Sequence, residues 1–189
     1  KRYAEAETLY RRALKTWEKA LGPDDLDVAV GLSNLGMVHR DQLRFAEAEP
    51  FYARALAIRE KALGPDHLNV AKSLGTLGDL FRSQGRYKEA EPIYERALSI
   101  REKALGPDHP DVAGILNSLA ELYSLQGRYA DAQPLFERSL AIREKALGPD
   151  HRDVAESLNS LGSLYRSLGR IAEAEPLVRR ALTIREKAF

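Results

Sequence analysis

The histidines are the side chains of this sequence with the widest chemical range, because an imidazole can ligate a metal or transfer a proton near neutral pH. Three of the four occupy equivalent positions 42 residues apart, at His67, His109 and His151. A zinc site needs its ligands within a few ångströms of one metal, whereas equivalent positions on neighbouring helical units are offset by about a helix diameter, ~10 Å. We therefore interpret these histidines as polar groups beside the starts of helices rather than as metal ligands.

No combination of residues predicts catalysis. The absence of cysteine excludes thiol nucleophiles, disulfides and thiolate zinc sites. The serines have no histidine at a matching position, and the glycines of Leu-Gly-Pro end helices rather than cradle phosphates. His39 replaces a tyrosine of the pattern described below, so we predict a packed or hydrogen-bonded histidine rather than a base. We expect no enzyme activity, no metal and no cofactor, while an enzyme domain elsewhere in a longer protein stays open.

The net charge and the hydropathy of the sequence argue against nucleic acids and membranes as partners. The 29 basic and 28 acidic residues leave a formal charge of +1, which does not favour nucleic acid or an anionic membrane surface. No apolar run reaches the ~20 residues of a membrane span. We expect a cytoplasmic protein. The sequence begins without methionine and in the middle of its pattern, which predicts a piece of a longer protein.

A repeat of 42 residues organises the whole chain, because Leu-Gly-Pro-Asp begins at Leu21, Leu63, Leu105 and Leu147. We predict a single domain over residues 1–189. It would hold a half repeat and four repeats, numbered first to fourth: 1–23, 24–65, 66–107, 108–149 and 150–189. Arg-Glu-Lys recurs near the end of each repeat's second helix. We interpret it as a solvated face with helix-end cations rather than as a row of ligand-binding side chains.

Each repeat carries two amphipathic helical patterns, A and then B. In the fourth repeat, helix A places Val154, Leu158, Leu161, Gly162 and Tyr165 on one face. Helix B runs from about residue 171 to 188. A mid-helix glycine costs about 1 kcal/mol relative to alanine, so Gly36, Gly78 and Gly162 need a packing reason. We expect them to let helix B approach closely, with Ala48, Ala90 and Ala174 as the facing residues.

These positions resemble the tetratricopeptide repeat signature, in which leucine, Leu-Gly, tyrosine and two alanines recur at the spacing of Leu158, Leu161, Gly162, Tyr165, Ala174 and Ala181. The 42-residue period is similar to the variant in kinesin light chains and many bacterial repeat proteins. The resemblance implies an all-α fold, a right-handed superhelix of antiparallel hairpins whose A helices line a concave groove. The sequence departs from it at His39, at Leu43 in place of a glycine, and at Thr16-Trp17 in place of Ile-Arg.

A second stripe on each A helix is polar and changes from repeat to repeat, which favours a binding surface, although drift of an idle surface would look the same. The predicted groove residues are Arg40, Lys72, Asp79, Arg82, Asn117, Glu121, Glu156, Asn159 and Arg166. The resemblance implies that Asn117 and Asn159 bind the main chain of a ligand. The lysine and asparagine pair that clamps a C-terminal carboxylate in other members is missing at Gly75 and Asp79.

The sequence therefore predicts a scaffold that binds a protein or peptide in the groove. The alternatives are a self-assembling structural array, a regulatory or sensor segment of a larger protein, and a designed repeat. Both ends lack a covering helix, so we also predict an end interface, and a possible homo-oligomer, through Tyr3, Tyr10, Trp17 and Phe189.

Overall fold

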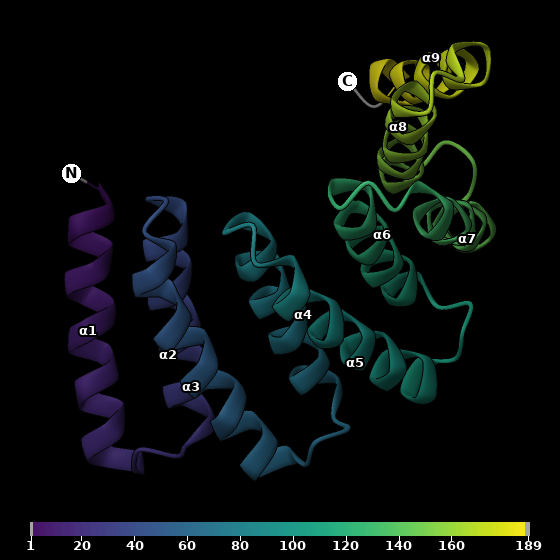
Figure 1. Ribbon diagram of the computed structural model, residues 1–189. Helices are drawn as coiled ribbons and strands as arrows, with labels where there is room; N and C mark the ends of the chain where they lie inside the picture. Colours follow the sequence, from purple (N-terminus) through teal and green to yellow (C-terminus); the bar gives the residue numbers. More distant parts are fainter. Residues whose placement is uncertain (1, 188–189) are drawn as a thin grey trace. The chain divides into compact units, whose positions relative to one another are not determined.

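The computed structural model describes residues 2–187, and all regular structure in that range is helical (Figure 1). The helices are α1 (Arg2–Leu21), α2 (Leu26–Asp41), α3 (Phe45–Leu63), α4 (Leu68–Ser83), α5 (Tyr87–Leu105), α6 (Pro110–Leu125), α7 (Tyr129–Leu147), α8 (Arg152–Ser167) and α9 (Ile171–Lys187). The all-α prediction is confirmed, with even-numbered A helices and odd-numbered B helices. Across this range, no helix combines the length and apolar character that crossing a bilayer requires.

The chain divides at a position within α5 into two compact units, an N-terminal unit (Lys1–Ile100) and a C-terminal unit (Arg101–Phe189). In the N-terminal unit, α2 packs against α1 and α3, and α3 packs against α4. In the C-terminal unit, α7 packs against α6 and α8, and α8 against α9. Each helix thus contacts mainly its neighbours along the chain, as expected for a repeat protein. The prediction of one domain over all repeats stays a prediction.

The loop histidines cap the A helices. The Nδ1 atoms of His67, His109 and His151 accept hydrogen bonds from the backbone N–H two residues later, at 3.0, 3.1 and 3.1 Å. Asp25 does the same for α2 at 2.8 Å. Each side chain satisfies one of the N–H groups that a helix start leaves without a partner. The interpretation of these histidines as polar groups at helix starts is confirmed.

The mid-helix glycines lie where helix B crosses closest to helix A. A Cβ atom on Gly36 or Gly78 would come within 2.7 Å of the ring of Tyr52 or Tyr94, and one on Gly162 within 2.9 Å of Val178. The predicted close approach is confirmed, and the atoms nearest to the Cβ positions of Gly36 and Gly78 belong to tyrosine rings.

The side chains over the glycines come one helical turn after Ala48, Ala90 and Ala174. These alanines are buried, and the carbonyl oxygen of Ala174 lies 3.6 Å from the Cβ position of Gly162. Residues four positions apart share one face of a helix. The small residue therefore allows the close approach, and the large one fills the space that the missing Cβ leaves.

An arginine after the A helix joins three helices in the second and fourth repeats, as the second repeat illustrates. Arg86 lies 4.3 Å from the ring centre of Phe81 in α4. It pairs with Glu89 in α5 at 2.7 Å and with Glu49 in the preceding B helix, α3. These hydrogen bonds, first that with Glu89, raise the pKa of the guanidinium above its ordinary value. In the fourth repeat, Arg170 makes the equivalent contacts with Tyr165, Glu173 and Gln133. We call this arrangement the arginine clamp.

The loops between repeats are also tied to the next B helix. Arg54 donates to the carbonyl oxygen of Pro23 at 3.2 Å and pairs with Glu18 at 2.7 Å. The same two contacts recur at Arg96, Arg138 and Arg180. The lysines of Arg-Glu-Lys pair back to the loop aspartates as Lys61–Asp24, Lys145–Asp108 and Lys187–Asp150. The lysine side chains are 60–73% exposed, which fits the interpretation of Arg-Glu-Lys as a solvated face, while its glutamates and lysines also bind neighbouring elements.

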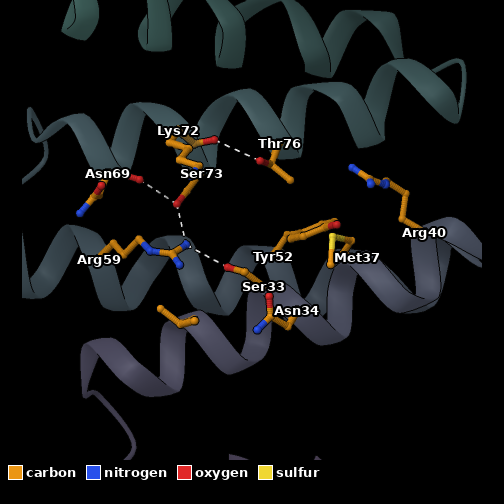
Figure 2. A pocket seen from close by; sticks show the side chains of 11 residues that line it. Ser33, Asn34, Met37, Arg40, Tyr52, Arg59, Asn69, Lys72, Ser73 and Thr76 are labelled. Carbon is orange, nitrogen blue, oxygen red and sulfur yellow. Dashed lines mark hydrogen bonds between the residues drawn. The ribbon is translucent and has the colours of Figure 1, made fainter. Parts of the chain in front are cut away.

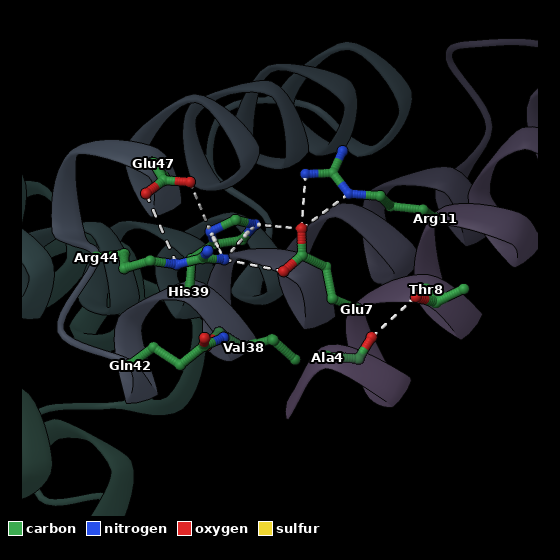
Figure 3. A network of polar contacts seen from close by, with 9 residues as sticks. All are labelled: Ala4, Glu7, Thr8, Arg11, Val38, His39, Gln42, Arg44 and Glu47. Carbon is green, nitrogen blue, oxygen red and sulfur yellow. Dashed lines mark hydrogen bonds and ion pairs between the residues drawn. The ribbon is translucent and has the colours of Figure 1, made fainter. Parts of the chain in front are cut away.

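The first repeat varies the clamp (Figure 3). His39 is buried and stacks on Phe51 at 5.2 Å between ring centres. The Nη2 atom of Arg44 lies 2.6 Å from His39 Nδ1 and donates to Glu7 of α1 at 2.9 Å. Because arginine can only donate, Nδ1 must accept, which makes the ring neutral with its proton on Nε2. The predicted packed, hydrogen-bonded histidine is confirmed. Leu43 replaces the glycine that ends helix A and takes a left-handed φ of 60°.

Replacing Gly78 by alanine should destabilise the chain by about 1–3 kcal/mol, because the new methyl group must displace Tyr94 from a packed position. The matched control is Gly114→Ala in α6, where the nearest atom, Arg101 Nη1, lies 4.0 Å from the Cβ position. That change should instead stabilise the chain by up to about 1 kcal/mol, the ordinary gain in a helix. Urea unfolding followed by circular dichroism measures both. A Gly78→Ala variant that is as stable as the control would contradict the packing argument.

His39 should make stability depend on pH. Burial lowers the pKa of His39 below its ordinary value, and the charge of Arg44 lowers it further, while Glu7 and Glu47 oppose the change and Arg11 adds to it. The unfolded chain therefore takes up the proton first as the pH falls, so this stabilisation is complete above the unfolded pKa of about 6.5 and is lost below it.

Unfolding free energies measured from about pH 7 to about pH 5.5 should fall more steeply for the wild type than for His39→Phe, by no more than the one-proton limit of about 1.4 kcal/mol per pH unit. The variant copies Phe81 of the second repeat, on which Arg86 already stacks. Parallel pH curves for the two proteins would show that His39 does not titrate in this way.

Candidate functional site

A cleft of about 440 Å³ lies between the two A helices of the N-terminal unit (Figure 2). One wall is α2, with exposed apolar side chains at Val30 and Met37, and the other is α4. Helix α3 supplies Tyr52 and Arg59 between them. The lining residues are Val30, Ser33, Asn34, Met37, Arg40, Tyr52, Arg59, Asn69, Lys72, Ser73 and Thr76. The cleft therefore follows the variable stripe of the A helices.

Arg59 holds the two walls of the cleft together. Its Nη1 atom donates to Ser33 of α2 at 3.0 Å and to Ser73 of α4 at 2.7 Å, and Nη2 donates to the carbonyl oxygen of Ala29 at 3.2 Å. Burial lowers the pKa of Arg59, although arginine stays protonated in proteins. The equivalent Arg143 is only 7% exposed and donates to Ser157 at 2.8 Å. These arginines form part of the packing rather than a solvated face.

The hydroxyl group of Tyr52 lacks a partner inside this cleft. Tyr52 is 4% exposed, and its hydroxyl has no hydrogen bond within residues 2–187. The equivalent Tyr94 donates to Asp79 at 2.6 Å. In the first repeat the position of that aspartate is occupied by Met37, whose thioether is only a weak acceptor. Burial raises the pKa of Tyr52, so the phenol stays protonated and can donate.

The predicted groove residues of the N-terminal unit divide into two pairs. Arg40 and Lys72 line the cleft. Arg40 pairs with its neighbour Asp41 at 3.0 Å, whereas Lys72 is exposed and has no ion pair in the described part of the chain. Asp79 and Arg82 lie outside the lining and contact each other at 3.4 Å. Asp79 also binds Tyr94, so its carboxylate already supports the fold.

In the C-terminal unit, the side chains of the two predicted asparagines contact other side chains of the same protein. Asn117 is 4% exposed, and its amide nitrogen donates to Glu121 at 2.7 Å. Its Oδ1 atom is buried without a hydrogen bond among the described residues. Asn159, with its oxygen turned toward Arg185, accepts from that guanidinium at 2.5 and 3.0 Å. Their binding to a ligand main chain stays a prediction.

Three predicted groove residues remain. Glu121 on α6 is half-buried and accepts from Asn117, whereas Glu156 and Arg166 on α8 are exposed. Glu156 pairs with Arg143 at 3.3 Å. Arg166 lines a second hollow of about 440 Å³ with Ser163, Ser167 and Ile171. The stripe of the C-terminal unit is thus mixed in charge, whereas the charged residues lining the cleft of the N-terminal unit, as far as the described residues show, are cations.

Sequence reasoning missed Tyr52 and Arg59 as lining residues, because both belong to a B helix. Tyr52 was not singled out, and Arg59 belongs to the Arg-Glu-Lys motif that was assigned to a solvated face. The useful signal for Tyr52 was Met37, which stands where the second repeat has the acceptor Asp79. The backbone of Arg59 lies on α3, next to the buried Ile58. Its long side chain reaches from there to both A helices, where the guanidinium donates to Ser33 of α2 and Ser73 of α4.

Of the residues predicted to form an end interface, the three that the structure describes are only partly exposed. Tyr3 is half exposed, and Tyr10 and Trp17 pack against the first core cluster. Trp17 lies over Gly31, where a Cβ atom would come within 2.9 Å of the indole ring. Phe189 lies outside the described residues. Self-association through the ends stays a prediction.

The described residues bring together no group of three or more histidine, aspartate or glutamate side chains that could hold a metal ion. The site with the clearest chemistry in the N-terminal unit is therefore the cleft. Its groups can bind a ligand through hydrogen bonds, charge and apolar contact.

Comparison with known proteins identifies related sequences and folds. The tetratricopeptide repeat family matches residues 1–61, 27–103, 82–145 and 111–187. The crystal structure of BtubC (BKLC) from P. vanneervenii is 30% identical, with a TM-score of 0.85 over 98% of this chain and 74% of that one. A putative kinesin light chain of Podosopora anserina with nearly identical TPR-like repeats is 24% identical, with a TM-score of 0.81 over 98% of this chain and 88% of that one.

MamA is 20% identical, with a TM-score of 0.65 over 94% of this chain and 87% of that one. The likenesses to the putative kinesin light chain and to MamA show the fold alone. None of the curated proteins matches the sequence.

Proposed function

Because this chain belongs to the tetratricopeptide repeat family, whose repeats generally serve as protein-interaction scaffolds, we propose that it binds a peptide or partner protein along the exposed stripe of its A helices. In the N-terminal unit the binding site is the cleft between α2 and α4. The chain acts by binding rather than by catalysis.

The unpartnered hydroxyl of Tyr52 is the observation that carries this proposal. A buried donor without an acceptor costs about 1–3 kcal/mol, and a ligand that supplies the acceptor recovers that cost. Tyr94 shows the satisfied form of the same tyrosine, with Asp79 as acceptor. A ligand carboxylate beside Met37 would take the place that Asp79 occupies in the second repeat.

The positive charges that line the cleft also favour an acidic group on the ligand. Arg40, Arg59 and Lys72 line it, and no acidic residue occurs among its described lining residues. Val30 and Met37 add exposed apolar surface on α2. We therefore propose as ligand an extended segment of protein that presents an aspartate or glutamate next to an apolar side chain.

Peptides selected on the wild-type chain from a random-peptide display library should be enriched in such acidic and apolar pairs. Lys72→Glu should weaken binding of a selected peptide at least tenfold, and Tyr52→Phe about tenfold, the value of one hydrogen bond to a charged group. The matched control is Lys88→Glu, the same charge change at an exposed lysine of α5 that does not line the cleft. Equal binding by the wild type and Lys72→Glu would place the ligand elsewhere.

The same tyrosines give a test that needs no ligand. Tyr52→Phe should leave the melting temperature unchanged or raise it, because the hydroxyl it removes has no partner in the described structure. Tyr94→Phe should lower the unfolding free energy by about 1–2 kcal/mol, because Asp79 loses a donor. If Tyr52→Phe were as destabilising as Tyr94→Phe, the hydroxyl of Tyr52 would have a partner within the protein, and the proposal would lose its main support.

A further inference from the structure

Met37 is the one sulfur-containing residue of the sequence, and it lines the cleft. The chain has a single methionine and no cysteine, so no other side chain offers sulfur to an oxidant. Met37 is 40% exposed on α2. A solvent-accessible thioether is oxidised to methionine sulfoxide, and dedicated reductases reverse that reaction. Oxidation at sulfur is therefore confined to the cleft.

The glycine before Met37 brings the ring of Tyr52 next to it. The ring carbon that carries the hydroxyl of Tyr52, Cζ, lies 2.9 Å from the Cβ position of Gly36. The same atom of Tyr94 lies 3.0 Å from the equivalent glycine position in α4, and its hydroxyl donates to the residue after that glycine, Asp79, at 2.6 Å. Figure 2 shows the side chain of Met37 turned toward the hydroxyl end of the Tyr52 ring. The two repeats therefore share one geometry and differ in the acceptor.

The sulfur of a methionine lies as many bonds from the backbone as the carboxylate oxygens of an aspartate. In Met37 that position holds a thioether, which is only a weak acceptor. The hydroxyl of Tyr52 is buried and has no hydrogen bond within residues 2–187. Oxidation adds a polar S–O group whose oxygen, one bond further out, is a strong acceptor. A sulfoxide at Met37 therefore supplies what Asp79 supplies in the second repeat.

A cation lies near the same hydroxyl. Burial raises the pKa of Tyr52, and the charge of Arg40 opposes that rise. Arg40 also lines the cleft. An oxygen atom on Met37 would therefore lie near two of the groups proposed to receive the carboxylate of a ligand, the hydroxyl of Tyr52 and the guanidinium of Arg40.

We propose that Met37 is a site of reversible oxidation, and that its sulfoxide accepts the hydrogen bond of Tyr52 and so competes with an acidic ligand for the cleft. The oxidant is a hydroperoxide. Its terminal oxygen bonds to the sulfur lone pair while the O–O bond breaks, and the proton of that oxygen passes to the departing oxygen, which leaves as water or an alcohol. The sulfur is oxidised by one electron pair and the hydroperoxide is reduced by the same pair. The effect on ligand binding rests on the proposed function, whereas the new hydrogen bond does not.

The first test needs no ligand. The full chain is treated with hydrogen peroxide, and peptide mapping by mass spectrometry locates the added oxygen atom at Met37. Oxidation should raise the melting temperature by about 2–4 °C, the shift expected for one hydrogen bond in a chain of this length. Tyr52→Phe should lose this rise, because it has no hydroxyl to donate. Methionine sulfoxide reductase should restore the original value in the wild type.

Two substitutions at Met37 remove the dependence on peroxide. Met37→Gln supplies a permanent acceptor, because the amide oxygen of glutamine lies as many bonds from the backbone as the sulfoxide oxygen. It should raise the melting temperature in the presence of Tyr52 and not together with Tyr52→Phe. Met37→Leu is the matched control, which keeps an apolar side chain and should not respond to peroxide.

Peptide binding provides the second test. A sulfur-free peptide selected on the reduced chain should bind the oxidised chain about tenfold more weakly, because the hydroxyl of Tyr52 is already hydrogen-bonded. The peroxide is removed before the titration. Met37→Leu, carried through the same treatment, should bind the peptide equally before and after it.

This proposal and the proposed function fail in different ways. If no peptide is selected but oxidation raises the melting temperature only when Tyr52 is present, the oxidation site stands and the proposed function is wrong. If peptides bind the reduced and the oxidised chain equally, the competition proposed here is wrong and the proposed function stands. An equal shift of the melting temperature in the wild type and Tyr52→Phe, or peroxide treatment that leaves Met37 unmodified in the folded chain, would overturn the oxidation site itself.

Discussion

The close approach of helix A to helix B within a hairpin is the constraint from which the site follows. A glycine on helix A lets a tyrosine ring of helix B lie against its backbone, as Tyr94 does over Gly78. The ring passes beside helix A and brings its hydroxyl, which is buried, next to the residue that follows the glycine. Whether the hydroxyl is satisfied depends on the residue after the glycine. Asp79 accepts it in the second repeat, and Met37 leaves it without an acceptor in the first.

Between repeats, packing is reinforced by long cations that reach neighbouring helices. In the second repeat the arginine clamp combines the aromatic face of Phe81 with carboxylates from two B helices, so the apolar stem and the charged head of one side chain both contribute. The pairs are partly exposed and individually weak, since surface ion pairs contribute about 0–1 kcal/mol. Their value lies in register, because a repeat displaced by one helical turn would lose every one of them together.

The sequence predicted the helices, the period and the caps well, because these depend on local patterns that recur four times. Arg40 and Lys72, which the same patterns assign to the variable stripe, line the cleft, and their part in binding stays a prediction. Periodicity assigns a residue to a face but does not say how far its side chain reaches. Arg59 was therefore missed, since its backbone lies on helix B while its guanidinium lies between α2 and α4.

Periodicity also did not predict the tyrosine side chains that cover Gly36 and Gly78. The spacing of small residues showed that two helices meet at Gly36 and Gly78, but not that the ring one turn beyond each alanine covers the gap. Asn117 illustrates the converse, because a polar residue on the variable stripe is buried at 4% exposure. Its depth depends on the neighbouring side chains of α6 to α8, which no pattern within one helix records.

The contacts between the Leu-Gly-Pro-Asp loops and the neighbouring helices affect how the number of repeats can change in evolution. Every repeat contains the cap of its own first helix, the arginine that binds backwards and the glutamate that binds forwards. An unequal crossover between the coding sequences of any two loops would therefore insert or remove a segment whose contacts on both sides are already complementary. Gene-level copying errors would lengthen or shorten the array without a new interface having to evolve, while substitutions such as Met37 for an acid would give individual copies their own specificity.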